Sequence, residues 1–138
     1  MGARDWLRRA TSMLVLGVAV AACRGVYQPL LVRPDAGLPP DAYSRCLGLM
    51  HARFGRLLVA DEATFRLQSD WVPGPKSDAA CQQRATIYRD SDSLACIVEV
   101  RHLGIGMFDT IPKWSAARTD TRMEEDLGDA VLRALSNG

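Results

Sequence analysis

The apolar residues of this 138-residue chain follow three different patterns along its length. Residues 10–22 form a run that contains no charge. In residues 41–56 the apolar positions recur at steps of three and four, and the same spacing returns in residues 121–135. In residues 64–103 many apolar positions alternate with polar ones. Because a helix repeats every ~3.6 residues and a strand every ~2, these patterns predict an apolar leader, two helices and several strands between them.

The first helix is predicted over residues 41–56. Pro39-Pro40-Asp41 is typical of a helix start, and Gly55 could end the helix. The predicted buried stripe consists of Tyr43, Cys46, Leu47, Met50, Phe54 and Leu57.

The last helix is predicted to begin at Thr121. Thr121 and Glu124 have the spacing of a capping box, in which hydroxyl and carboxylate each bind a free backbone amide. The predicted buried stripe of this helix consists of Leu127, Val131, Ala134 and Leu135.

The strands are predicted at residues 64–72 and in a hairpin over residues 84–103 that turns at 91–93. A further short strand could form at residues 107–111. The first strand directs Phe65, Leu67 and Trp71 inward, and the second arm of the hairpin directs Leu94, Cys96, Val98 and Val100 to one face. We therefore expect an α+β fold, an antiparallel sheet of three to four strands with an N-terminal and a C-terminal helix packed on one face.

The N-terminus has the pattern of a secretory signal peptide. Arg4, Arg8 and Arg9, against a single Asp5, precede the uncharged run. The run is short for a membrane span, which needs about 20 apolar residues. An uncleaved N-terminal anchor is the alternative.

The end of the apolar run, Val20-Ala21-Ala22-Cys23, resembles the lipobox of bacterial lipoproteins. The resemblance implies cleavage before Cys23, a diacylglycerol thioether on its sulfur, and attachment to a lipid membrane of the cell envelope, facing the periplasm. Arg24 follows the cysteine where some inner-membrane lipoproteins have aspartate, which implies the outer membrane. The residues after Cys23 show no motif of a specific family.

These boundaries divide the chain into a signal peptide (1–22), a lipidated extended tether (23–40) and one small α+β domain (41–138). Four prolines and no alternation favour an extended conformation for the tether, in which Leu30-Leu31-Val32 could dock on the domain.

The charge balance bears on the class of partner. Without residues 1–22 the 17 basic residues fall to 14 and the 16 acidic residues fall to 15, which leaves a net charge of about −1. A nucleic-acid-binding protein normally has a strong basic excess. We therefore expect no nucleic-acid partner.

No catalytic set or cofactor motif stands out in the sequence. His51 and His102 are the only histidines, and no cysteine or histidine pair has metal-ligand spacing, so we expect neither a metal site nor a cofactor. Cys96 near His102 could suggest a thiol nucleophile, although a cysteine among apolar residues is more typical of a core. We expect a non-enzymatic accessory or binding component of an envelope complex. A periplasmic hydrolase or redox enzyme, or a module for an apolar ligand, is the alternative.

The predicted outer face of the strands is the candidate partner face. It carries Arg66, Arg84, Tyr88 and Arg101. Such a face is commonly just solvated sheet surface. As a functional hypothesis, it docks an acidic or planar envelope protein.

Three cysteines remain beside Cys23. If the strand at 64–72 follows the first helix directly, Cys46 and Cys81 meet at one end of the domain and Cys96 lies at the other end. The distance from Cys81 to Cys96 would then exceed the ~7 Å between Cα atoms that a disulfide tolerates. The predicted bridge is Cys46–Cys81, with Cys96 a buried free thiol.

Overall fold

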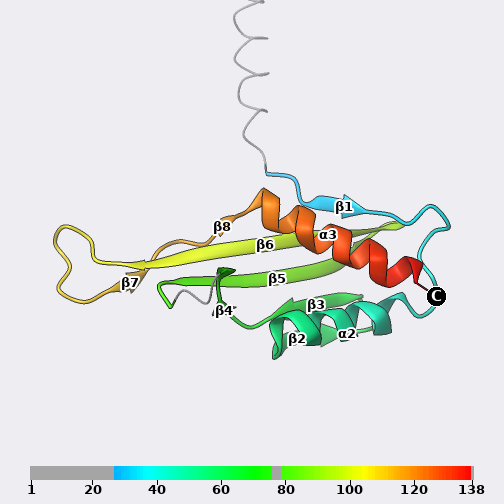
Figure 1. The fold of residues 1–138 in the computed structure, drawn as a ribbon, viewed down its shortest axis with the longest axis horizontal. Coiled ribbons are helices and arrows are strands. Elements are labelled where there is room, and N and C mark those ends of the chain that lie inside the picture. The colour runs from blue at the N-terminus through cyan, green and yellow to red at the C-terminus, as the bar shows by residue number, and fades with distance from the viewer. Residues whose placement is uncertain (1–26, 76–78, 138) are drawn as a thin grey trace, which may run out of the picture.

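The computed structural model describes residues 27–75 and 79–137, which form an antiparallel sheet with two helices against it (Figure 1). The strands are β1 (Leu30–Val32), β2 (Leu57–Asp61), β3 (Arg66–Ser69), β4 (Val72–Pro73), β5 (Cys81–Asp90), β6 (Ser93–Gly104), β7 (Lys113–Trp114) and β8 (Arg118–Thr119). Five of these eight strands lie in the order β1-β6-β5-β3-β2. The short strand β4 pairs with β5, and β7 and β8 pair with β6.

The hairpin of β5 and β6 forms the centre of the sheet and is confirmed. Ten residue pairs join the two strands, from Cys81 opposite His102 to Asp90 opposite Ser93. Ser91, in the two-residue connection, has a φ of 55°, a left-handed conformation that suits a tight hairpin turn.

Two strands lie in segments for which the sequence pattern predicted no strand. β2 lies directly after the first helix and pairs with β3. β1 lies within the predicted tether and pairs with β6. A Cβ on Gly128 of the last helix would lie 2.7 Å from Leu30 Cδ2, so this glycine lets β1 approach the helix closely. Three residues of the predicted tether therefore belong to the sheet.

The helices α2 (Ala42–Phe54) and α3 (Thr121–Ser136) lie on the same face of the sheet (Figure 1). Gly55, with a φ of 71°, ends α2, and its N–H donates to the His51 carbonyl. The two helices and the inward positions of β3, β5 and β6 share one apolar core. Its largest fully buried side chains are Met50, Leu67, Ile87, Leu94, Leu127, Val98 and Val131.

The predicted size of the sheet is wrong. In place of three to four strands the described residues form eight, and the sheet extends beyond the two helices (Figure 1). The additional strands span two to five residues each, which is too short for an alternating pattern to stand out. The strand expected at residues 107–111 is not formed.

The start of α3 also differs from the expected capping box. Asp120, rather than Thr121, caps the helix: its Oδ1 accepts from the Met123 amide at 3.0 Å. Glu124 is 2% exposed and turns toward the sheet, where its Oε1 accepts from the Val98 amide of β6 at 3.3 Å. The carboxylate satisfies a strand amide instead of a helix amide.

The predicted Cys46–Cys81 disulfide is not formed, and no disulfide joins any two cysteines of the described residues. The prediction took the strand at 64–72 to follow the first helix directly. β2 intervenes and reverses the chain once more, so the start of α2 lies at the turn end of the hairpin.

A ring contact shows this position of α2 directly. Tyr43 meets Phe65 edge to face, with ring centroids 5.4 Å apart. Cys46 therefore shares the core with Cys96, which is a buried free thiol as predicted. Cys81 begins β5 at the opposite end of the hairpin.

The helices cover only one half of the central hairpin (Figure 1). From the turn to the Ala85–Val98 pair, the apolar inward side chains are buried. Beyond this pair β6 becomes progressively exposed toward Leu103 and Gly104. We call residues 79–84 and 99–118 the arm and the rest of the described chain the body.

Within the described residues, no helix has the length and apolar character that crossing a membrane requires. The predicted signal peptide, the lipobox and Cys23 lie outside the described residues.

Candidate functional site

The sheet face opposite the helices carries a hollow with a volume of about 710 Å³. Outward positions of β3, β5 and β6 contribute much of its lining, because alternate residues of a strand share a face. The lining residues are Tyr27, Thr64, Arg66, Gln68, Arg84, Thr86, Tyr88, Arg89, Ile97, Glu99 and Thr119. We call this surface the open face. Three arginines against one glutamate make it basic, which suits an anionic ligand.

The two central arginines of the open face have different surroundings. Arg84 is held by Glu99, whose Oε2 lies 2.7 Å from Arg84 Nη2 and 2.9 Å from Nε. The Arg66 side chain is exposed, and its guanidinium makes no hydrogen bond or ion pair within the described residues. One guanidinium is therefore oriented by the fold, and the charge of the other is available to a ligand.

Two phenols stand beside these arginines. Tyr27 donates its hydroxyl hydrogen to Glu124 Oε1 at 2.5 Å. Burial and this carboxylate raise the pKa of the Tyr27 phenol well above its ordinary value. The Tyr88 hydroxyl makes no hydrogen bond within the described residues, so it can donate to or accept from a ligand.

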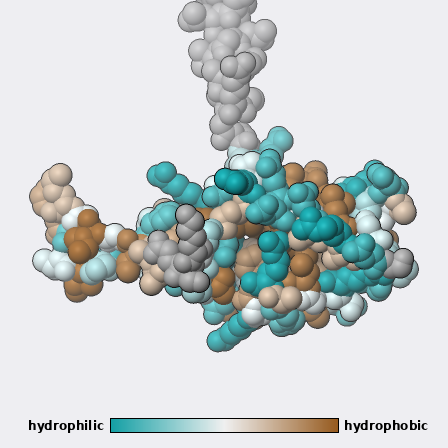
Figure 2. All heavy atoms as spheres, in the orientation of Figure 1, coloured by the Kyte–Doolittle hydropathy of each residue, from teal (hydrophilic) through white to brown (hydrophobic). Residues whose placement is uncertain are grey.

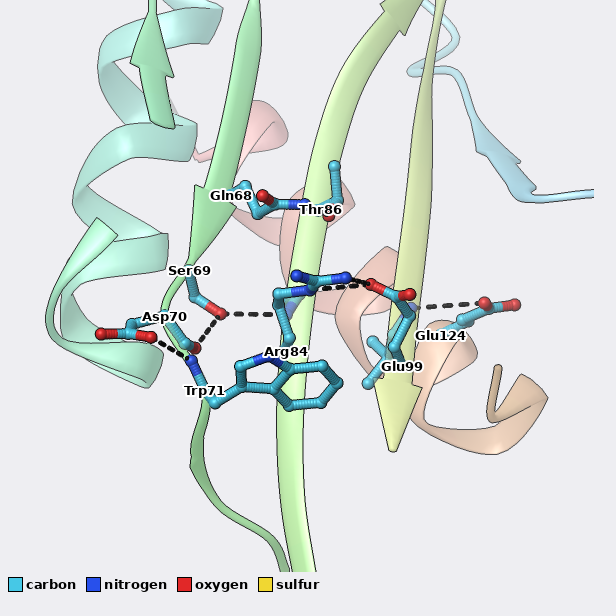
Figure 3. A network of polar contacts seen from close by, with 10 residues as sticks. Gln68, Ser69, Asp70, Trp71, Arg84, Thr86, Glu99 and Glu124 are labelled. Atoms are coloured by element: carbon cyan, nitrogen blue, oxygen red, sulfur yellow. Dashed lines mark hydrogen bonds and ion pairs between the residues drawn. The ribbon is translucent and has the colours of Figure 1, made fainter. Parts of the chain in front are cut away.

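Two buried side chains hold the strands beneath the open face (Figure 3). At the Ala85–Val98 pair the neighbouring strands leave gaps in the ladder on both sides. Ser69 Oγ accepts from the Ala85 amide at 3.0 Å, and Glu124 Oε1 accepts from the Val98 amide. Both strand amides thus have a partner, as buried backbone groups require.

The fourth residue predicted for the partner face, Arg101, does not line the hollow and lies further along the arm. Its guanidinium carbon lies 4.1 Å from the ring centroid of Trp71 and 4.8 Å from that of Trp114. Its Nη2 and Nε both donate to Gln82 Oε1, at 2.6 and 2.9 Å. Arg66, Arg84 and Tyr88 line the hollow together, whereas Arg101 is engaged between two indole rings.

Trp71 was expected to face the core, and this is wrong. Its ring lies against the guanidinium of Arg84, whose carbon is 4.7 Å from the ring centroid (Figure 3). The guanidinium of Arg101 contacts the same ring. The alternation fails because β3 ends at Ser69 and the next amide, of Asp70, donates to the Arg56 carbonyl instead of the ladder.

A second hollow, of about 360 Å³, lies where the arm meets the body and includes His102, Ser115 and Asp120. Ser115 Oγ accepts from the His102 amide and donates to the Ala116 carbonyl. Asp120 Oδ1 caps α3. The hydroxyl and the carboxylate are committed to backbone groups, so they form no acid–base chain with the His102 ring.

Cys96 and His102, the alternative pair for thiol chemistry, do not meet. They are six positions apart on β6, about 20 Å at the rise of a strand, and Cys96 faces the core. Burial, with Cys46 and Glu124 nearby, raises the pKa of the Cys96 thiol to about 12. A protonated, enclosed thiol is a poor nucleophile.

The part of the chain that the structure describes contains no group of three or more histidine, cysteine or acidic side chains placed to hold a metal ion.

The sequence reasoning missed Tyr27 and gave Glu99 no role. Tyr27 lies in a proline-rich segment without period, and only the pairing of β1 with β6 brings it to the open face. Glu99 lies directly opposite Arg84 in the hairpin, and opposite charges directly across two strands favour an ion pair.

Comparison of the chain with known protein families, with characterised proteins and with solved structures finds no match.

Proposed function

We propose that this chain is a non-enzymatic lipoprotein of the bacterial envelope, and that its open face binds an acidic segment of a protein partner. The observation that carries the docking proposal is the pair of arginines in the hollow. Arg84 is oriented by Glu99, and exposed Arg66 has no counter-ion among the described residues. A carboxylate of the partner would supply that counter-ion.

The rest of the lining suits the same ligand. The Tyr88 hydroxyl can donate to a second carboxylate oxygen, and Gln68 and Thr86, joined by a 3.1 Å hydrogen bond, offer further polar atoms. Hydrogen bonds between guanidinium and carboxylate are stronger than neutral ones and fix orientation. Hydrogen bonds and charge pairing of this kind bind a carboxylate without any catalytic group.

Photocrosslinking in cells that produce the full chain tests the docking site. A photoreactive residue at position 68 should capture a partner through an acid-rich segment, which mass spectrometry identifies. Arg66→Glu should abolish this adduct, whereas Arg56→Glu, a charge reversal at an exposed position outside the hollow, should leave it unchanged. Retention of the adduct in Arg66→Glu, or no adduct at all, would contradict the proposal.

The membrane anchor rests on Val20-Ala21-Ala22-Cys23. One acyl chain gives only marginal attachment, whereas the several chains of a lipoprotein cysteine give stable attachment, here proposed at the outer membrane. Labelled palmitate should enter the wild-type protein but not Cys23→Ser, which should accumulate as an uncleaved precursor. Equal labelling of both proteins would refute the anchor and leave the docking site to be judged by its own test.

A further inference from the structure

The arm ends in a loop, residues 105–112, that projects away from the body (Figure 1). Ile105, Met107, Phe108 and Ile111 of this tip loop are 64%, 93%, 95% and 69% exposed. Figure 2 shows apolar side chains gathered at this end of the molecule. Folding leaves these four large side chains in water, and clustered exposure of this kind marks an interaction site.

The tip loop is built as a defined structure. β7 closes its base by pairing with β6, with Leu103 opposite Trp114 and Gly104 opposite Lys113. Inside the loop the Asp109 amide donates to the Gly106 carbonyl at 3.1 Å. Lys113 Nζ lies 2.8 Å from Asp109 Oδ1, so the one carboxylate of the loop is already paired with a cation.

The residues behind the apolar tip are aromatic and basic. Trp114 contacts the guanidinium of Arg101, and Arg118 lies further along on β8. Between residues 101 and 118 there are three basic residues and one acidic residue, a net charge of +2. From tip to base, the arm thus presents an apolar layer and then an aromatic and cationic layer.

We propose that the tip loop inserts into the surface of a lipid bilayer that carries anionic phospholipid headgroups. Apolar side chains that enter the acyl boundary, with tryptophan and basic residues at headgroup level, match the order of layers in a membrane interface. Insertion by about 5–10 Å keeps the loop backbone out of the hydrocarbon centre, where its polar groups would lack partners.

A protein partner fits this feature less well. Specific protein interfaces bury about 1,200–2,000 Å², and a projecting loop with four apolar side chains supplies only a small part of that area. A bilayer surface requires no complementary pocket. The inference is independent of what the open face binds.

Fluorescence of the full chain in vesicles of phosphatidylethanolamine and phosphatidylglycerol tests the insertion. After subtraction of the wild-type spectrum, the emission added by Phe108→Trp should shift to the blue and be quenched by brominated acyl chains. The matched variant Leu58→Trp, at a half-exposed position of edge strand β2 in the body, should show neither change. Equal quenching of the two variants, or none at Phe108→Trp, would overturn the proposal; an unquenched tip would indicate a protein partner.

The charge at the base provides a second test. Each basic residue near an anionic surface contributes about fivefold to binding, so Arg118→Glu should lower the insertion equilibrium of Phe108→Trp by about fivefold or more. Vesicles of phosphatidylcholine alone should show reduced insertion and no effect of Arg118→Glu. Insertion that is equally strong in both lipids would contradict the anionic specificity.

Discussion

The two halves of the β5–β6 hairpin share one ladder of hydrogen bonds but differ in what covers them. In the body half, Ala85 and Ile87 of β5 and Cys96 of β6 are 0% exposed beneath the helices. In the arm half, neither of the two described helices covers the ladder, and β6 ends in exposed residues. Polar and ring contacts replace the core there, above all the contacts of Arg101 with Trp71 and Trp114.

This difference distinguishes the contribution of backbone hydrogen bonds from that of apolar burial in the same pair of strands. Backbone hydrogen bonds give both halves their geometry, but each contributes only about 0.5–1.5 kcal/mol net. Burial of apolar surface supplies most of the stability, and the apolar core that the helices share with the sheet lies in the body. We therefore expect the body to control the free energy of unfolding and the arm to open locally at lower cost.

The largest expected effect comes from truncating the core. Ile87→Ala should lower the free energy of unfolding by about 2–5 kcal/mol, because it removes buried methyl groups and leaves a cavity. Phe108→Ala, at the exposed tip of the arm, is the matched control and should change it by less than about 0.5 kcal/mol. Urea denaturation measures both, and comparable losses would break the distinction between body and arm.

The second-largest loss of stability is expected from a substitution at the boundary between body and arm. Glu124→Ala leaves the Val98 amide and the Tyr27 hydroxyl without their acceptor, at an expected cost of about 1–3 kcal/mol. Glu124→Gln keeps an acceptor oxygen and should cost less. A Glu124→Ala protein with wild-type stability would mean that the Val98 amide, in the gap of the ladder beside β6, needs no side-chain acceptor.

Long elements could be predicted from the sequence, and short ones could not. The central hairpin and both helices have enough residues for their periods to show. β2 was missed because Leu57 also fits the stripe of the preceding helix, and this omission displaced Cys46 to the wrong end of the domain. β1 was missed because prolines surround its three residues. Both strands are stabilised by pairing with distant parts of the chain, which local pattern does not report.

The same limit applies to the candidate site. Alternation was sufficient to place Arg66, Arg84 and Tyr88 on one face. It failed at Trp71, where the chain leaves the ladder after Ser69. The apolar character of the tip loop is visible in the sequence, but its exposure depends on where the helices end over the sheet.

A pH titration sharpens the comparison, because both thiols with strongly raised pKa lie in the body. Burial raises the pKa of Cys46 and of Cys96 from 9.0 to about 12. Between these values the unfolded thiols lose their protons and the folded ones keep them. The unfolding free energy should therefore fall as pH rises above 9, by about 1 kcal/mol per pH unit for each thiol.

Urea denaturation between pH 8 and pH 10, below the range in which the Tyr27 phenol would add to the slope, measures the contribution of the thiols. Cys46→Ala removes one of the two thiols and should reduce the slope by about half, whatever it does to stability at pH 8. A slope that is identical in Cys46→Ala and the wild type would show that other groups cause the loss.

The smallest expected effect concerns the contacts that order the arm. Arg101→Leu removes the cation that lies between Trp71 and Trp114, an interaction of about 0.5–1 kcal/mol at a partly exposed site. Hydrogen exchange of the Ser115 amide, which donates to the His102 carbonyl, should accelerate by about two- to fivefold, while the Val98 amide stays protected. Arg118→Leu, which removes an exposed cation without a described ring contact, is the control and should leave both amides unchanged. Acceleration at Val98 as well would mean that arm and body open together. The arm would then be a cooperative part of the core rather than a separate, weakly held extension of its two central strands.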